Sequence, residues 1–412
     1  MKMHRVWIVL FLSVGIAFWG SLGCSETPNN QQDSGTSEPA GTTETNTPSE
    51  PTSQADTTTS GPEAGPEPGP EPQPEPEPVP DPYKIELFNR TRINSRGEYN
   101  GKKYENVRKA TKEFEIKKGT YEKVELVVAL RTTCYPFEQW KDDPRPSGHN
   151  WPPNCDAYDR NFEFTMTPVV PEGDPQPTGF ELVRAITPFG GPMDFRIDVT
   201  HLANTKPGKH TMRVNIGTWA DGKGKVSGAN GGWYVSAYLD VKPGPNRQRV
   251  IDVISLFNTN YKDQEGKQQE VKFTLPEGTR KTVLEYRVTG HGGGAMDQAC
   301  IGHADEFCKR THRLFADGKE FQNFIPWRSD CKKFCTRIQT MFGERCKENP
   351  TGSIRSVEAP RANWCPGSLT SPILREIPAF QKPGEHTFGY LVEKVAKGGS
   401  WRVSATLIVY GN

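Results

Sequence analysis

The chain has 412 residues, and its 51 basic and 50 acidic residues leave a net charge of +1. This balance excludes a general attraction to nucleic acid, so no nucleic-acid partner is expected, and it excludes binding to anionic membrane surfaces by charge alone. Hydrophobic residues make up 33% of the chain, and its 40 Gly and 36 Pro favour strands joined by turns.

The first 23 residues have the features of a secretory signal peptide. Lys2 and Arg5 precede a largely apolar run at 6–19, which is too short for a membrane span. Cys24 follows Ser-Leu-Gly, a context that resembles the processing site of bacterial lipoproteins, where the cysteine becomes the lipidated N-terminus. Leu usually lies three positions before that cysteine, where this chain has Ser21. Ordinary cleavage nearby with a leftover thiol is therefore the alternative.

The residues after Cys24 bear on the membrane that an anchored protein would occupy. Ser25 and Glu26 lack the aspartate that often retains lipoproteins at the inner membrane. We therefore expect an exported lipoprotein held by Cys24, at the outer membrane or cell surface.

Residues 24–82 are rich in Thr, Ser, Glu, Pro and Gly, and they end in Gly-Pro-Glu-Pro repeats. Such a composition cannot offset its ordering entropy, so the segment is expected to be disordered, with polyproline character at its end. At ~3.1 Å per residue, the proline-rich end could reach about 70 Å. We interpret the segment as a tether between a membrane and a folded part.

The rest of the chain contains an internal repeat. Its matching segments keep their order and nearly their spacing, which predicts two similar domains at 83–245 and 246–412, joined near 242–249. The matching pairs are 114–120 with 273–279, 206–211 with 382–387, and 231–239 with 398–407.

Strand patterns recur in both predicted domains. Apolar residues alternate or run for strand-like lengths between turns, which predicts an all-β fold of the sandwich or jelly-roll type. The expected strands include 124–130, 162–167, 195–199, 233–241 and 403–410.

An acidic residue lies beside a cysteine in each half. The first segment is Cys-Asp-Ala-Tyr-Asp-Arg at 155–160, and the second is Asp-Glu-Phe-Cys-Lys-Arg-Thr-His at 305–312. A third segment, Arg-Ala-Asn-Trp-Cys-Pro-Gly, follows at 361–367. A disulfide would stiffen the backbone where a carboxylate must be held against an arginine, which suits a binding or catalytic site.

These three segments resemble the peptide-N-glycosidase F family of bacterial amidases, which remove Asn-linked glycans from glycoproteins. The resemblance extends thinly over about residues 83–412. It implies two consecutive eight-stranded antiparallel jelly rolls packed side by side, with the active site in the cleft between them. It also implies an N-glycoprotein or glycopeptide substrate and no cofactor, and we expect a monomer.

The resemblance assigns roles residue by residue. Asp159 matches the essential aspartate and Glu306 its supporting glutamate, while Arg160 and Arg361 match arginines that bind substrate. Hydrolysis of an amide needs a base to activate water and donors for the developing negative charge, and these residues fit that need. Each alone is more often a solvated surface residue, but their order and neighbouring cysteines favour a site.

Two further matches and one departure concern the sugar site. Trp219 matches an aromatic residue that lines it, although a Trp near a strand end is more often core. His291 stands where the family has a cleft tryptophan. The family has a second glutamate where this chain has Gly217, so activity could be weakened, shifted to other glycans or lost, unless Asp221 substitutes. The alternative is a non-catalytic glycan-binding or structural surface lipoprotein.

The nine cysteines are an odd number, and lipidation of Cys24 would leave an even set in an oxidising compartment. In the family a bridge also lies next to the first catalytic acid, and another ends at the Trp-Cys-Pro-Gly motif. Sequence alone does not determine the pairing. We expect Cys134–Cys155, Cys300–Cys308, Cys335–Cys346 and Cys331–Cys365.

Metal chemistry is the remaining possibility. Cys300, His303, Cys308 and His312 have a spacing that can bind zinc, but a disulfide is the more probable fate of exported cysteines. A pair of jelly rolls also resembles copper-dependent hydroxylating monooxygenases, a minor alternative. Copper needs clustered histidines and a methionine ligand, and the eight histidines here are neither adjacent nor alternating. We expect no metal.

Overall fold

The protein is described from a computed structural model that covers residues 80–411 except 135–143, 221–223, 225–226, 263–265, 295, 342 and 350–351. The predicted signal peptide, Cys24, the tether up to residue 79 and Asp221 lie outside the described residues. Everything described belongs to one compact unit. Within it, no helix has the length and apolarity needed to cross a membrane.

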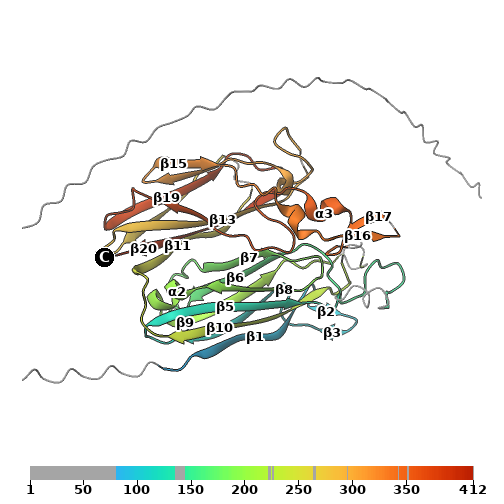
Figure 1. Cartoon of the computed structure of the whole chain (residues 1–412), viewed down its shortest axis with the longest axis horizontal. Coiled ribbons are helices and arrows are strands. Elements are labelled where there is room, and N and C mark those ends of the chain that lie inside the picture. The colour runs from blue at the N-terminus through green and yellow to red at the C-terminus, as the bar shows by residue number, and fades with distance from the viewer. Residues whose placement is uncertain are drawn as a thin grey trace, which may run out of the picture. The chain divides into compact units, whose positions relative to one another are not determined.

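The strands between residues 83 and 243 form two four-stranded antiparallel sheets, ordered β1-β10-β5-β8 and β4-β9-β6-β7 (Figure 1). A two-stranded hairpin, β2-β3, and a short helix, α2, complete this half. The bounds are β1 (Tyr83–Asn94), β2 (Glu98–Tyr99), β3 (Lys102–Lys103), β4 (Lys109–Ile116), β5 (Tyr121–Arg131), β6 (Asn161–Pro168), β7 (Phe180–Ile186), β8 (Met193–Asp198), α2 (Thr200–Thr205), β9 (Gly208–Ile216) and β10 (Gly232–Pro243).

The strands between residues 250 and 410 form two more four-stranded sheets, ordered β11-β20-β13-β18 and β12-β19-β14-β15. The bounds are β11 (Val250–Tyr261), β12 (Gln269–Leu275), β13 (Lys281–Gly292), η1 (Asp305–Phe307), β14 (His312–Ala316), β15 (Lys319–Phe324), η2 (Cys331–Phe334), β16 (Arg337–Thr340), β17 (Gly343–Cys346), α3 (Ile354–Glu358), β18 (Ile373–Glu376), β19 (Gly384–Val392) and β20 (Gly399–Tyr410).

Alternating side chains explain why these segments are strands. In β5, Val124, Leu126, Val128 and Leu130 are buried and the residues between them are more exposed, as expected for a strand with one face on a core. These side chains belong to the apolar core between the two sheets of the first half. A second core, which includes Trp401, lies between the sheets of the second half.

The two halves have the same strand order. β1, β10, β5 and β8 correspond to β11, β20, β13 and β18, and the second sheets correspond in the same way. This agreement explains the internal repeat and confirms the predicted all-β, two-part antiparallel architecture. The predicted strand at 195–199 is one residue too long, because β8 ends at Asp198. The domain boundary stays a prediction.

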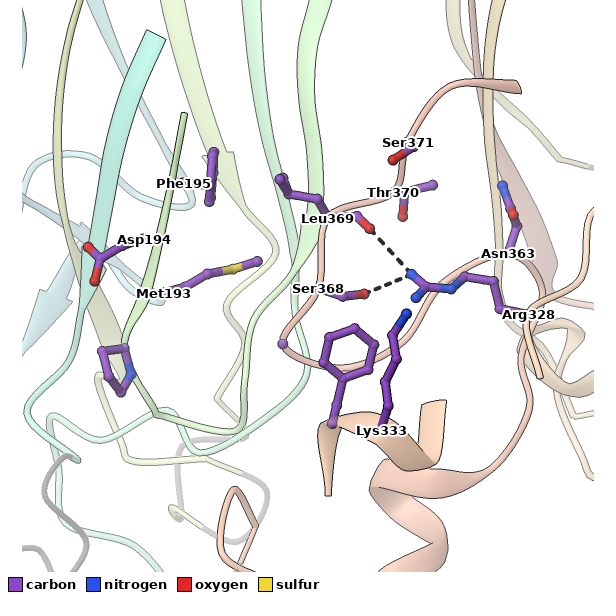
Figure 2. Close-up of a pocket in the computed structure, with 13 residues that line it drawn as sticks. Met193, Asp194, Phe195, Arg328, Lys333, Asn363, Ser368, Leu369, Thr370 and Ser371 are labelled. Carbon is purple, nitrogen blue, oxygen red and sulfur yellow. Dashed lines mark hydrogen bonds between the residues drawn. The ribbon is translucent and has the colours of Figure 1, made fainter. Parts of the chain in front are cut away.

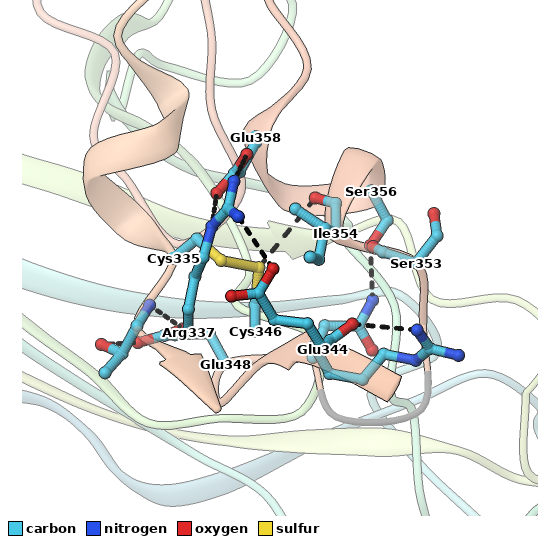
Figure 3. The surroundings of a disulfide bond; sticks show 12 residues. Cys335, Arg337, Glu344, Cys346, Glu348, Ser353, Ile354, Ser356 and Glu358 are labelled. Carbon is cyan, nitrogen blue, oxygen red and sulfur yellow. Dashed lines mark hydrogen bonds and ion pairs between the residues drawn. A yellow bond between two sulfur atoms is a disulfide. The ribbon is translucent and has the colours of Figure 1, made fainter. Parts of the chain in front are cut away.

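Four disulfides link the expected partners: Cys134–Cys155, Cys300–Cys308, Cys331–Cys365 and Cys335–Cys346. The last of these closes the base of the β16–β17 hairpin (Figure 3). There, Arg337 donates hydrogen bonds to Glu344 and to Glu358 at the end of α3. The disulfide thus closes the hairpin, and the ion pair of Arg337 with Glu358 joins the hairpin to α3.

Candidate active site

Asp159 lies in the loop that connects Cys155 to β6. The neighbouring Asp156 is fully buried and accepts hydrogen bonds from Ser227 Oγ at 3.0 Å and from Trp233 Nε1 at 3.2 Å. A Cβ at Gly228 would lie 2.2 Å from Pro152 O, so only glycine allows the two segments to approach so closely. The loop is therefore fixed by its disulfide, by Asp156 and by this contact.

Arg160 is bound to the same loop. Its Nε lies 3.1 Å from both Asp156 carboxylate oxygens, its Nη2 donates to Asp156 Oδ1 at 2.9 Å, and Nη2 also donates to Trp219 O at 3.2 Å. The guanidinium lies over the Tyr158 ring at 4.8 Å. This arginine therefore stiffens the loop, and its charge acts on Asp159 from close by.

Glu306 lies in η1, in the connection between β13 and β14. The preceding residue, Asp305, is fully buried and accepts hydrogen bonds from Arg310 Nε and from the Ala396 backbone N–H, both at 3.0 Å. The Cys300–Cys308 disulfide closes this connection, and Glu306 O accepts a hydrogen bond from the Ala362 N–H at 2.8 Å. Glu306 is thus fixed beside the segment that carries Arg361.

Arg361 comes from the second half and reaches the first. Its Nη2 lies 3.6 Å from Asp159 Oδ2 and donates a short hydrogen bond to Ser356 O. The guanidinium lies between the rings of Phe307 and Trp364, at 4.9 and 4.6 Å from their centroids. Its side chain is only 2% exposed, and its Nε and Nη1 have no hydrogen-bond partner among the described residues.

The surroundings shift the acidity of this group of residues. Burial raises the pKa of Asp159 to about 6, against the opposing charge of Arg361. Burial, together with the negative charge of Asp159, raises the pKa of Glu306 to about 7. Near neutral pH the pair therefore holds one carboxylate and one carboxyl group that readily keeps its proton, which suits acid–base chemistry.

Trp219 and His291 were expected to bind substrate, and Gly217 stands where the family has a glutamate. Trp219 is 43% exposed and lies beside Arg160. His291 is half-buried, and its ring stacks on the Trp364 ring with 5.4 Å between the ring centroids. Trp364 in turn contacts Arg361, so His291 is linked to Arg361 indirectly. A Cβ at Gly217 would have no atom within 4 Å, so the position of the family glutamate is open space here.

The four residues whose spacing could bind zinc do not form a ligand set, because the Cys300 and Cys308 sulfurs are bonded to each other. Among the described residues, one group of three potential metal ligands lies close together, formed by Cys335, Cys346 and Glu358. Its two sulfurs also form a disulfide, so this group is not a metal site.

A groove of about 650 Å³ lies next to the candidate site (Figure 2). Met193 and Phe195 line it from β8, and Arg328 and Thr370 line it from the second half. Arg328 forms reciprocal backbone hydrogen bonds with Arg361, at 2.9 and 3.0 Å. The groove and the candidate site therefore share this segment of backbone, although Asp159 and Glu306 are not among the residues that line the groove.

The structure thus brings Asp159, Glu306 and Arg361 together, with Arg160 adjacent and Trp219 and His291 at the margin. The sequence did not reveal that Asp156 and Asp305 are the buried anchors of the two loops, or that Phe307 and Trp364 enclose Arg361. A signal existed for the anchors, because each is an aspartate followed four or five residues later by an arginine.

Part of the second half of the chain is similar to a known protein family. Residues 257–408 match the family described as "Peptide-N-glycosidase F, C terminal". No curated protein matches the chain.

Solved structures share the fold over most of the described chain. PNGF-II matches with a TM-score of 0.58 and 21% identity, over 80% of this chain and 66% of that one, just under two thirds. PNGase F of Flavobacterium meningosepticum, described as a glycosylasparaginase, matches with a TM-score of 0.57 and 16% identity, over 81% and 97%. Residues 257–408 therefore match the model of the peptide-N-glycosidase F family, in a chain that has the fold of these solved structures.

Proposed function

We propose that this protein is an amidase of the peptide-N-glycosidase type, which hydrolyses the glycosylated Asn side chain of glycoproteins or glycopeptides. The observation that carries the proposal is that Asp159, from the first half of the chain, lies close to Glu306 and Arg361, which both come from the second half. Two solved structures of the same fold are described as a glycosylasparaginase and as a peptide-N4-(N-acetyl-β-D-glucosaminyl)asparagine amidase, which supports this assignment.

In this mechanism Asp159 acts as the base. Its carboxylate takes a proton from a water molecule, whose oxygen attacks the amide carbon and forms the new C–O bond. The C–N bond then breaks, and the leaving nitrogen takes a proton from Glu306 or through water. The products are Asp and a glycosylamine, which loses ammonia in water to give the free glycan.

Arg361 has a supporting role in this mechanism. Its buried guanidinium lies 3.6 Å from Asp159 and lowers the pKa of that carboxyl from the higher value that burial alone would give. The base therefore remains ionised near neutral pH. All these groups belong to the protein, so the proposed reaction requires no cofactor.

We also propose that the protein works outside the cell, as a monomer tethered by a lipid on Cys24. The four disulfides are typical of an exported protein and support this location. The substrate would then be glycoprotein encountered at the cell surface.

The direct test is incubation of the purified protein with a denatured N-glycoprotein, followed by mass spectrometry of the peptide and the sugar. The proposal expects Asn to become Asp at the former glycan site, together with an intact released glycan. Cleavage within the glycan would instead identify an endoglycosidase. An unchanged substrate would refute the amidase.

One observation favours a second candidate, a glycan-binding protein that has lost its chemistry. Gly217 leaves open the position where the family has a glutamate, so one carboxylate of the family's set is missing. Retention of N-glycans by the protein on a glycan array, with no hydrolysis of any of them, would select this candidate.

A further inference from the structure

The two halves meet across a seam of buried polar side chains. Four charged residues form what we call the seam network: Glu163 on β6, Glu181 and Arg184 on β7, and Arg402 on β20. Their side chains are 9%, 0%, 1% and 12% exposed, respectively. Charged side chains are rarely so buried unless they are paired. A buried ion pair often adds little net stability, because the loss of hydration offsets the attraction between the charges. Stability alone therefore does not explain why these residues are present.

One ion pair of the network crosses the seam directly. Arg402 Nε lies 3.0 and 3.2 Å from the two carboxylate oxygens of Glu163, and its Nη2 lies 3.2 Å from one of them. Nη2 also donates to Asn258 Oδ1 on β11. Burial tends to raise the pKa of Glu163, but Arg402 and Arg184 outweigh this effect and lower it, so the pair is ionic.

The other ion pair lies within the first half and binds the second half by hydrogen bonds. Arg184 Nε and Nη2 donate to Glu181 at 2.9 and 2.6 Å, while Nη1 donates to the backbone oxygens of Arg287 and Arg402. Ser404 Oγ donates in turn to Glu181. Each half therefore contributes an arginine, Arg184 or Arg402, whose side chain is held by hydrogen bonds to the other half.

The network connects to both sides of the candidate site. On the first side, Glu163 lies on β6, the strand into which the loop of Asp159 leads. On the second side, a continuous chain of contacts leads to Arg361: Arg184 Nη1 to Thr289 Oγ1 at 3.5 Å, Thr289 Oγ1 to His291 Nε2 at 2.8 Å, His291 to Trp364 at 5.4 Å, and Trp364 to Arg361 at 4.6 Å.

We infer that the seam network is a positioning device, which sets the distance between Asp159 in one half and Arg361 and Glu306 in the other. Apolar faces can slide over one another at little cost, whereas displacement of a buried bidentate pair leaves charges without partners. Glu163, Arg184 and Arg402 are thus positioning residues. The expected effect of the network on catalysis rests on the proposed function, but its expected effect on the pKa of Asp159 does not.

The expected signature is a change in the acidity of Asp159. The charged groups that face it are Arg361 and Glu306 from the second half, and Arg160 and Asp156 from its own loop. Arg361 lowers the pKa of Asp159, so a network that no longer holds Arg361 in place allows this pKa to rise. The acid limb of the rate profile, where Asp159 must lose its proton, then moves to higher pH.

Glu163→Gln and Thr289→Val test the inference at two separate links. Glu163→Gln keeps the shape but removes the charge of the pair, and Thr289→Val removes only the hydroxyl between Arg184 and His291. We expect kcat on a glycopeptide to fall by about tenfold to a hundredfold with little change in KM, and the acid limb to rise by about one pH unit. Leu239→Ala, in the core of the first half, is the control for lost stability, and its pH profile should match that of the wild type.

The pKa of Asp159 should also be measured directly, by NMR titration of the carboxyl carbon in protein labelled with ¹³C-aspartate. If the wild type hydrolyses glycopeptides and both folded variants keep its kcat and its pH profile, the inference is wrong and the proposed function stands. If the wild type hydrolyses nothing, the proposed function fails, and the titration of Asp159 then tests the inference on its own. An Asp159 pKa that is unchanged in both Glu163→Gln and Thr289→Val then overturns the inference as well.

Discussion

Asp159 and Glu306 are two partly buried carboxyl groups beside a single buried guanidinium. Their pKa values of about 6 and about 7 lie well above the ordinary values of such groups, because burial disfavours the charged forms more than Arg361 favours them. Such an arrangement lowers folding stability near neutral pH, and perturbed pairs of this kind are typical of functional sites.

The first prediction concerns catalysis. Asp159→Asn keeps the shape of the side chain but removes the base, so hydrolysis of a glycopeptide should slow by about 10²–10⁴-fold. Glu306→Gln should slow it less, because Glu306 supports the charge and does not accept the proton from water. Steady-state rates of the two variants and of the wild type give the comparison. An Asp159→Asn enzyme with the wild-type rate would end this mechanism.

The second prediction concerns stability against pH. The pKa of Asp159 rises from 3.8 to about 6 on folding, so the folded state holds this proton more tightly than the unfolded state. The resulting cost is absent well below pH 3.8, where both states are protonated, grows as the pH rises from 3.8, and is complete above about pH 6. Asp159→Asn should therefore raise the free energy of unfolding by about 1–3 kcal/mol at pH 7. In urea titrations this gain should disappear towards pH 4, and a gain that is constant with pH would contradict the shift.

The third prediction uses the open position at Gly217. A Cβ there meets no atom within 4 Å, so Gly217→Glu should fold normally and place a carboxylate where the family has one. If that glutamate assists the reaction, the variant should hydrolyse glycopeptides faster than the wild type. Gly217→Gln, which adds the same bulk without charge, is the matched control. Equal rates for all three proteins would show that the missing carboxylate does not limit the reaction.

At the scale of elements, short connections closed by disulfides hold the site. Cys300–Cys308 spans a sequence separation of 8 and encloses η1 with Glu306, whereas Cys331–Cys365 spans 34 and links η2 to the segment after Arg361. A short loop loses little entropy on closure, so the first bridge should contribute less to stability than the second, about 2.5 against about 4 kcal/mol. We expect the Cys300–Cys308 bridge to act mainly by orienting Glu306.

The fourth prediction separates these two contributions. Replacement of both Cys300 and Cys308 by Ser should lower Tm less than the same change at Cys331 and Cys365, and it should still reduce kcat by about tenfold or more because η1 loosens. Thermal denaturation and rates of the two double variants provide the test. If activity follows Tm in both, the first bridge has only a structural role.

The strands were predictable because each has a local signal. In β5 the alternation at 124–130 identifies a strand with one face on a core, and the repeat predicts that the second half copies the first. The seam could not be predicted in this way. Charged residues on a strand are ordinarily expected at the surface, and the docking of β20 turns Glu163, Glu181 and Arg184 into buried partners.

The candidate site was predictable where one segment carries both an acid and its cysteine. Asp159 and Glu306 were named from the resemblance of such segments to a known family, and the structure places both beside Arg361. The burial of Arg361 between Phe307 and Trp364 depends on contacts between separate loops, so no local pattern indicates it. The sequence therefore named residues of the candidate site but not their surroundings.

For the whole molecule, the fifth prediction concerns attachment. If Cys24 carries a lipid, Cys24→Ser should move the protein from the membrane fraction to the soluble fraction without changing its fold. Cell fractionation with an antibody against the folded part measures the first effect, and circular dichroism of the purified variant measures the second. Continued membrane association of the folded variant would contradict the anchor.

The two loops that hold Asp159 and Glu306 occupy the same place in the repeated strand order, since one precedes β6 and the other precedes β14. Each loop is closed by a disulfide and anchored by a buried aspartate paired with an arginine, Asp156 with Arg160 and Asp305 with Arg310. The site therefore takes one acid from each copy of the repeat. A chain that carried a single copy would hold only half of the pair, so both copies are needed to complete the site.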